Sequence, residues 1–206
     1  MKKNVVMWCL LVTATLTLSA QQSEQQIKKE IGQFAVSMKT LQCDFVQTKH
    51  LKMLNDKMVS RGKMYYSQSN RLRWEYVTPY TYTFILNNDK VLLKNKKRSD
   101  VIDVRQNKVF REIARMMMNS VVGDCLNDSK SFKNSISDRG GEWIATLVPL
   151  RKEMKQLFQT IFLHFNKKQG VVTSVEMVEK NGDRTIIELK NIKKNETIAN
   201  NIFDFH

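Results

Sequence analysis

The chain has 206 residues, of which 42% are apolar and 26% are charged, so it is long enough to bury the core of one domain. This composition excludes collagen-like, disordered and disulfide-dense chains, and three cysteines with three histidines offer little material for a metal site. Lysine and arginine number 34 against 20 acidic residues, and the resulting net charge of +14 leaves anionic partners open.

Residues 1–20 have the pattern of a secretory signal peptide. Lys2 and Lys3 supply the positive start, an apolar stretch follows, and small residues close the segment. An ordinary N-terminal helix is the alternative, but the sequence becomes sharply polar after residue 20. We therefore expect cleavage after Ala20, export of the chain, and a single domain over residues 21–206.

The next segment predicts an amphipathic helix followed by strands. Apolar residues recur every three or four positions over residues 23–41, and Ser23 with Gln26 resembles a capping box. After Leu41 the period falls to two, which is typical of strands with one buried face. The inward side chains of these strands are mainly aromatic, namely Phe45, Met64, Tyr66, Leu72, Trp74, Tyr76, Tyr82 and Phe84.

These eight residues predict either a dry core or the wall of an apolar cavity. Leu72 follows a turn at residues 67–70, so we expect it near the rim of the sheet, where water can reach it. Further strands are expected at roughly 90–94 and 98–104.

A second helix is predicted over residues 108–121. Phe110, Ile113 and Met117 share one apolar stripe, which contains three consecutive methionines. Such a stripe indicates either core packing or a movable apolar lid, because flexible methionine side chains adapt to varied ligands.

Beyond residue 131 the period is again two. Five strands are expected, at roughly 131–137, 142–148, 158–166, 171–179 and 183–192. A short helix follows Pro149, and the alternation from Ile202 to Phe205 predicts a last strand. The whole chain then has about ten or eleven strands with two or three helices, and its short turns require antiparallel pairing.

Motifs for catalysis or cofactor binding are missing from the sequence. It contains no nucleophile elbow, zinc-protease, phosphate-loop or dinucleotide-binding pattern. His50 and His164 could act as acid and base in a basic secreted hydrolase, although nothing in the sequence brings them together. Cys43 and Cys125 either form a disulfide in an oxidising compartment or remain buried thiols. We expect no enzyme, no cofactor and no metal.

Basic residues cluster at the predicted turns. Lys90, Lys94, Lys96, Lys97 and Arg98 surround one turn, and lysine pairs mark two others. Solvated strand ends explain such clusters without any partner. Peripheral contact with an anionic membrane surface also stays open, whereas no nucleic-acid motif accompanies the charge.

Several motifs together resemble those of a known family. Phe45-x-Gln47 is followed by Gly62-Lys63-Met64-Tyr65, and the chain then runs from Arg71-Leu72-Arg73-Trp74 to Pro79 before an Asn88-Asp89-Lys90 turn. The order and spacing of these motifs over about 41–92 are similar to those of the periplasmic outer-membrane lipoprotein carrier (LolA-like) family. That resemblance implies an incomplete, strongly curved antiparallel barrel with helices covering an apolar cavity.

The resemblance also implies a function and partners. Members of the family hold the acyl chains of lipoproteins and move them across the periplasm to the outer membrane. The implied partners are acylated lipoproteins, an inner-membrane lipoprotein-releasing transporter and an outer-membrane acceptor, with a monomeric carrier. The family commonly has an Arg-Pro pair where Gln68 and Ser69 stand, so an arginine that fastens the lid cannot be assigned here. A sensor or adaptor domain of the same fold is the alternative.

Overall fold

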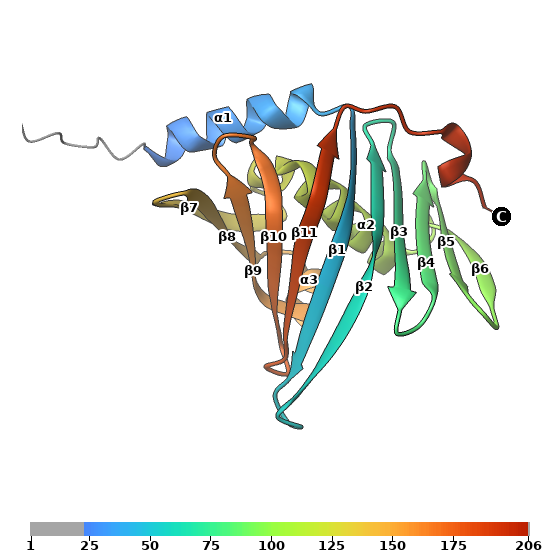
Figure 1. Cartoon of the computed structure of the whole chain (residues 1–206). Coiled ribbons are helices and arrows are strands. Elements are labelled where there is room, and N and C mark those ends of the chain that lie inside the picture. The colour runs from blue at the N-terminus through green and yellow to red at the C-terminus, as the bar shows by residue number, and fades with distance from the viewer. Residues whose placement is uncertain (1–22, 206) are drawn as a thin grey trace, which may run out of the picture.

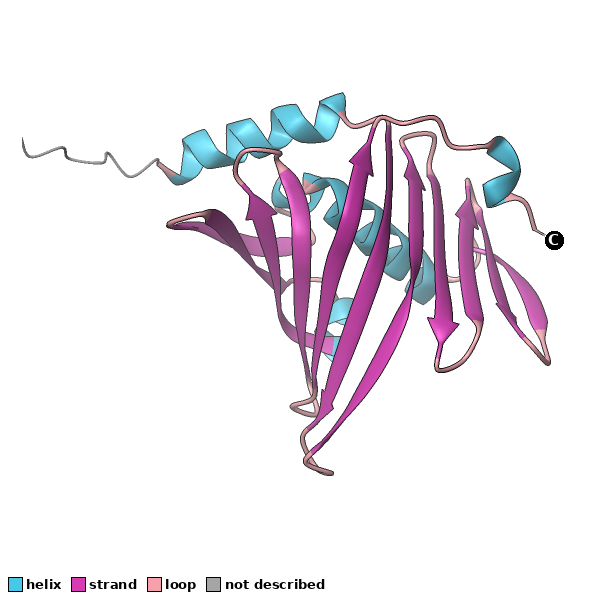
Figure 2. Ribbon diagram, viewed as in Figure 1, coloured by secondary structure: helices cyan, strands magenta, loops and turns pink. Residues whose placement is uncertain are grey.

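The computed structural model describes residues 23–205, so the predicted signal peptide at residues 1–20 lies outside this part of the chain. The described residues form three α-helices and one sheet of eleven strands (Figures 1 and 2). The helices are α1 (Glu24–Ser37), α2 (Lys108–Val122) and α3 (Lys152–Leu157). The strands are β1 (Thr40–Leu51), β2 (Asp56–Ser67), β3 (Arg71–Thr78), β4 (Tyr82–Asn87), β5 (Lys90–Asn95), β6 (Ser99–Asp103), β7 (Phe132–Arg139), β8 (Glu142–Pro149), β9 (Phe158–Asn166), β10 (Val171–Glu179) and β11 (Arg184–Lys194).

The sheet is antiparallel throughout and is not closed. Its strand order is β6-β5-β4-β3-β2-β1-β11-β10-β9-β8-β7. Strands that follow each other in sequence lie side by side, except that β6 and β7 form the two edges, and β1 pairs with β11 in the middle. The edge strands β6 and β7 are joined through α2, which crosses behind the sheet in the view of Figure 1. The structure confirms the predicted open antiparallel architecture with a few covering helices.

The sheet has two distinct ends. The helix α1 lies across one of them, which we call the α1 end (Figure 1). The β1–β2, β3–β4 and β10–β11 turns lie at the opposite end, which we call the hairpin end. The connection from β8 through α3 to β9 belongs to the hairpin end as well, because neighbouring strands alternate in direction.

Local sequence explains where the first helix begins. The Ser23 hydroxyl accepts a hydrogen bond from the Gln26 backbone N–H at 3.2 Å, which caps α1 as its sequence predicts. The apolar stripe of this helix buries Ile27 and Ile31 completely. The α1 end of the sheet is therefore closed by tight packing.

The second helix ends at a glycine that no other residue could replace without strain. Gly123 caps α2 with a φ of 81°, in the left-handed region. A Cβ atom at this position would also come within 2.7 Å of the Phe165 ring and 2.8 Å of the Ile31 side chain. Both the turn and the close approach of the helices require glycine here.

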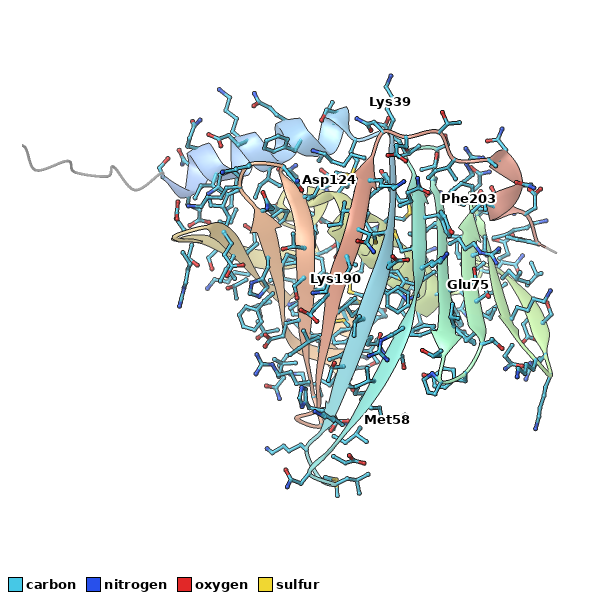
Figure 3. All side chains as sticks on the ribbon, in the orientation of Figure 1. Lys39, Met58, Glu75, Asp124, Lys190 and Phe203 are labelled. Carbon is cyan, nitrogen blue, oxygen red and sulfur yellow. The ribbon has the colours of Figure 1, made fainter. Side chains whose placement is uncertain are left out.

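The C-terminal segment corrects one expectation from the sequence. Residues Asn200–Phe203 form a 3-10 turn, whereas the alternation from Ile202 to Phe205 predicts a strand. The segment follows β11, which lies in the middle of the sheet. Because β1 and β10 already pair with both edges of β11, the segment finds no free strand edge beside it. It crosses the outer face instead, and Phe203 packs on Ile85 and Leu92 there (Figure 3).

That packing also explains why β4 and β5 bury residues on both faces. Arg71 stacks its guanidinium over the Phe203 ring at 4.8 Å, and Arg73 donates a hydrogen bond to the Ile202 carbonyl at 3.2 Å. The two arginines that follow the turn at residues 67–70 thus hold the C-terminal segment.

Two further features bear on the sequence analysis. Cys43 and Cys125 are separate buried thiols, as one of the two alternatives expects. Within residues 23–205, no helix combines the length and the apolar character that crossing a bilayer requires.

Candidate functional site: an apolar cavity under α2

A partly open cavity of about 310 Å³ lies between the inner face of the sheet and α2. Its volume falls in the range of small-molecule binding sites. The wall comes from strands in both halves of the sheet and from α2, and consists of Gln47, Trp74, Tyr76, Tyr82, Phe84, Ile113, Met116, Met117, Ser120, Val121, Phe158, Ile161, Val172, Val175, Met177, Ile187 and Leu189.

The wall is almost wholly apolar. Gln47 and Ser120 are its only polar members apart from two tyrosines, and none of these side chains is charged. A site of this kind favours hydrocarbon, because it offers a large area for burial and few fixed hydrogen-bonding groups.

An aromatic cluster forms one side of the cavity. The ring centroids of Phe45 and Trp74 lie 4.5 Å apart, and the rings of Phe45 and Tyr76 are nearly perpendicular with centroids 5.1 Å apart. The Tyr76 hydroxyl donates a hydrogen bond to Gln47 Oε1 at 2.8 Å. Burial raises the pKa of Tyr76 to about 12, so its hydroxyl stays neutral and the cluster carries no charge at neutral pH.

The structure places half of the predicted sheet residues on the cavity wall. Trp74, Tyr76, Tyr82 and Phe84 line it. Phe45, Met64, Tyr66 and Leu72 face the same side of the sheet but pack in the core outside the wall. The period of two identifies the inner face correctly, but it carries no information on where along a strand the helices leave space.

Leu72 in particular lies elsewhere than expected. Its side chain is fully buried, with no exposed surface, whereas its position after the turn at residues 67–70 predicts access to water. Leu72 pairs across the sheet with Tyr66 and Leu86, which are buried too. This expectation was wrong because the α1 end of the inner face is completely covered.

The predicted lid residues also lie in two different environments. Ile113 and Met117 face the cavity, whereas Phe110 packs against the core outside the wall. Val121, which continues the predicted apolar stripe, also lines the cavity, as do Met116 and Ser120, which the sequence did not assign to the lid. Sequence reasoning missed the whole contribution of β9, β10 and β11, although their alternating apolar residues carry the signal that identifies the wall in β3 and β4.

Ion pairs fasten α2 to the rest of the molecule. The buried Glu112 carboxylate lies 3.5 Å from both Arg115 and Arg151. Arg151 also donates a hydrogen bond from Nε to the Ser131 hydroxyl at 2.8 Å, and Lys108 pairs with Glu153 of α3 at 2.7 Å. This set of contacts, at the start of α3, stands far from the turn that contains Gln68 and Ser69.

The two histidines of the hydrolase alternative do not form a pair. His50 lies in β1 near the hairpin end, and His164 lies in β9. Two strands separate them, which corresponds to at least about 14 Å between strand axes. His164 instead contacts the Glu142 carboxylate at 3.1 Å. Among residues 23–205, the structure brings together no group of three side chains able to hold a metal ion.

These features define the class of protein: an open antiparallel half-barrel with a helix over an apolar cavity. The sequence matches the model of the family described as outer membrane lipoprotein carrier protein LolA over residues 36–206. The chain therefore belongs to the LolA family.

Individual relatives agree with this assignment. The chain is 24% identical over 186 residues to an outer-membrane lipoprotein carrier protein of Methylococcus capsulatus, covering 90% of this chain and 86% of the relative. It is also 24% identical over 202 residues to the protein of the same description from Pseudomonas fluorescens, with 98% and 94% covered.

Solved structures show that the fold recurs. An uncharacterized conserved protein from Thermus thermophilus matches with a TM-score of 0.52 and 11% identity, over 88% of this chain and 93% of that one. The MucA/MucB complex of Pseudomonas aeruginosa matches with a TM-score of 0.52 and 10% identity, over 86% of this chain and 60% of the other.

Proposed function

We propose that this protein is a periplasmic carrier that binds the acyl chains of lipoproteins in the cavity under α2 and delivers them to the outer membrane. The observation that carries the proposal is the uncharged, almost wholly apolar wall of that cavity. Membership of the LolA family and the names of the relatives from Methylococcus and Pseudomonas support it.

Transport through water explains why such a wall is needed. Each CH₂ group of an acyl chain that leaves water for an apolar site gains about 0.8 kcal/mol. A carrier that covers several such groups can hold an acyl chain by burial alone, so neither catalysis nor a cofactor is required. Trp74, Tyr76, Tyr82 and Phe84, together with the wall residues of α2, β9, β10 and β11, would form the contact surface.

The lid role is assigned to α2. Ile113, Met116 and Met117 are only half-buried where they cover the cavity, and unbranched methionine side chains adapt to chains of different length. Release of the Glu112–Arg151 and Lys108–Glu153 pairs would free the helix to move outward. An inner-membrane lipoprotein-releasing transporter and an outer-membrane acceptor are the partners that family membership suggests.

Export is part of the proposal. The signal peptide predicted at residues 1–20 would direct the carrier to the periplasm, and protein recovered from its host should begin near Gln21 without acylation. Mass analysis of the N-terminus checks this. An uncut chain would contradict periplasmic delivery.

Two measurements test acyl binding. Mass spectrometry of purified protein should find co-purified lipid or acylated peptide, and a fluorescent fatty acid should bind at the cavity. Met177→Glu should abolish that binding while the protein stays folded, because Met177 lines the wall and is only half-buried. Val178→Glu is the matched control, since neighbouring residues of β10 point to opposite faces.

Equal binding by wild type, Met177→Glu and Val178→Glu would refute the cavity as the acyl site. A protein without bound lipid and without fatty-acid binding would leave a sensor or adaptor of the same fold. Replacement of His50 and His164 by Gln should leave binding unchanged, because burial needs no proton transfer. Loss of function in that folded variant would favour the hydrolase.

A further inference from the structure

Exposed apolar side chains gather at the hairpin end of the sheet. Large apolar residues are exposed at three of the connections there. They are Met53, Leu54 and Met58 at or beside the β1–β2 turn, Val77 and Tyr80 at the β3–β4 turn, Leu150 before α3 and Leu157 at the end of α3. Single exposed apolar residues are ordinary, but a group at one end of a molecule marks an interaction surface.

The β1–β2 hairpin extends furthest at this end. Its two strands have 12 residues each, and their turn passes beyond the β10–β11 turn beside it (Figure 1). Met53 is 93% exposed and Leu54 is 70% exposed. Met58, near the start of β2 in the same hairpin, is 47% exposed (Figure 3). We call these three residues the apolar tip.

The base of this hairpin is held firmly. Asp183 accepts a hydrogen bond from the Lys52 backbone N–H at 3.0 Å, and Lys49 pairs with Glu179 at 2.9 Å. The Lys52 hydrogen bond lowers the pKa of Asp183, so its carboxylate stays ionised at any pH near neutral. The apolar tip is thus presented on a fixed base.

Unpaired positive charge surrounds the apolar tip. Lys52, Lys57 and Lys180 are exposed and form no ion pair within residues 23–205. The β5–β6 turn adds Lys96 and Lys97, and α3 adds Lys152 and Lys155 at the same end.

Part of the negative charge at this end is neutralised. Asp100 and Glu153 pair with Arg98 and Lys108, Glu179 and Asp183 share Lys49, and Asp56 at the start of β2 forms no ion pair within residues 23–205. The hairpin end therefore offers free lysines around apolar side chains, a combination that fits the phosphates and hydrocarbon of an anionic bilayer.

The cavity lies toward the same end. Tyr76, Tyr82 and Phe158 lie at or close to the hairpin ends of their strands, and all three are half-buried wall residues. A surface that contacts this end would therefore face the accessible part of the wall.

We propose that the β1–β2 hairpin docks this protein on anionic lipid bilayers, with the apolar tip inserted among the acyl chains and the surrounding lysines against the headgroup phosphates. This docking goes beyond carriage of cargo, because it brings the cavity itself to the membrane surface. It requires no lipoprotein and no protein receptor.

The test measures sedimentation with lipid vesicles, using protein purified after export and no cargo. Wild type should bind vesicles of 70% phosphatidylcholine and 30% phosphatidylglycerol more tightly than pure phosphatidylcholine. The double variant Met53→Ser, Leu54→Ser should weaken binding by at least about tenfold, because two inserted side chains are lost. Val36→Ser is the control, since Val36 is exposed on α1 at the other end and should change nothing.

Two further variants separate insertion from charge attraction. Leu54→Trp should show a blue-shifted, lipid-quenchable emission with anionic vesicles. Lys52→Glu with Lys57→Glu should weaken binding to anionic vesicles and hardly change binding to neutral ones. The proposal would be overturned if wild type did not bind vesicles at low salt, even if it bound an acidic protein instead. Unchanged vesicle binding by the Met53→Ser, Leu54→Ser variant would overturn it as well.

Failure of docking and failure of acyl carriage remain distinguishable. Fatty-acid binding is measured without vesicles, and the Met53→Ser, Leu54→Ser variant should retain it in full, because neither residue lines the cavity.

Discussion

Side chains on the inner face of the sheet are more deeply buried at the α1 end than toward the hairpin end, although the sequence pattern is the same at both ends. Along β3, Leu72 is fully buried, Trp74 is 8% exposed, and Tyr76 is half-buried at the cavity. Along β1, Leu41 is buried near α1, whereas Gln47 reaches the cavity wall. An alternating strand therefore stabilises the fold at its α1 end and forms a binding surface toward its hairpin end.

The largest effect is expected where the inner face is closed. Leu72→Glu should prevent folding or cost several kcal/mol, since the carboxylate would enter a fully buried position without a partner. Val77→Glu on the same strand is the control and should cost less than about 0.5 kcal/mol, because Val77 is exposed. Urea unfolding of both variants measures the difference. A stable Leu72→Glu protein would show that this end holds accessible space.

The two helices offer a second comparison of the same kind. Ile31→Ala in α1 should cost about 2–5 kcal/mol, because Ile31 is fully buried and a cavity would remain. Met117→Ala in α2 should cost less than about 1 kcal/mol, since Met117 is half-buried beside existing space. Thermal unfolding measures both. Equal losses would mean that α2 packs as tightly as α1.

A smaller effect is expected from the buried carboxylate of α2. Glu112→Gln should cost about 1–2 kcal/mol, less than for a fully buried ion pair, because Arg115 and Arg151 are partly exposed. Amide hydrogen exchange should become faster in α2 and stay unchanged in α1. Lys108→Gln is the control, since its pair with Glu153 is more exposed. Faster exchange in both helices would contradict a local role for Glu112.

The smallest effect appears only at high pH. Burial raises the pKa of Cys43 and of Cys125 to about 12, from an ordinary value near 9. The neutral thiols therefore contribute stability that is complete below pH 9 and is lost as the pH rises toward 12. The free energies of unfolding measured with urea at pH 8 and pH 10 should differ less in Cys43→Ala than in wild type, by on the order of 1 kcal/mol. An unchanged difference would argue that Cys43 is open to solvent.

The sequence predicted the elements well because each depends on neighbours along the chain. The capping by Ser23 and the alternation in β3 are local patterns, and both are confirmed. The same alternation was present in β10 and β11, where Val175, Met177 and Ile187 line the cavity. These residues could have been assigned from the sequence, but the family motifs lay only in the first half of the chain.

Other features depend on contacts between distant segments, which no periodicity encodes. Burial of Ile85 and Leu92 on the outer face results from Phe203, which crosses more than a hundred residues later in the chain. The contact between Glu112 in α2 and Arg151 just before α3 likewise links two residues that are separated in the sequence by a loop and the strands β7 and β8. The burial of the Leu72 side chain depends on where α1 and α2 lie over the sheet, and the position of these helices is a property of the whole fold.

The pairing of β1 with β11 joins the first strand of the described chain to the last. During synthesis or passage through a membrane channel, β1 can form a hairpin with β2, but its other edge stays open until β11 emerges. Contacts between such distant segments form slowly, because a long loop must close first. The topology therefore delays completion of the sheet until nearly the whole chain is available.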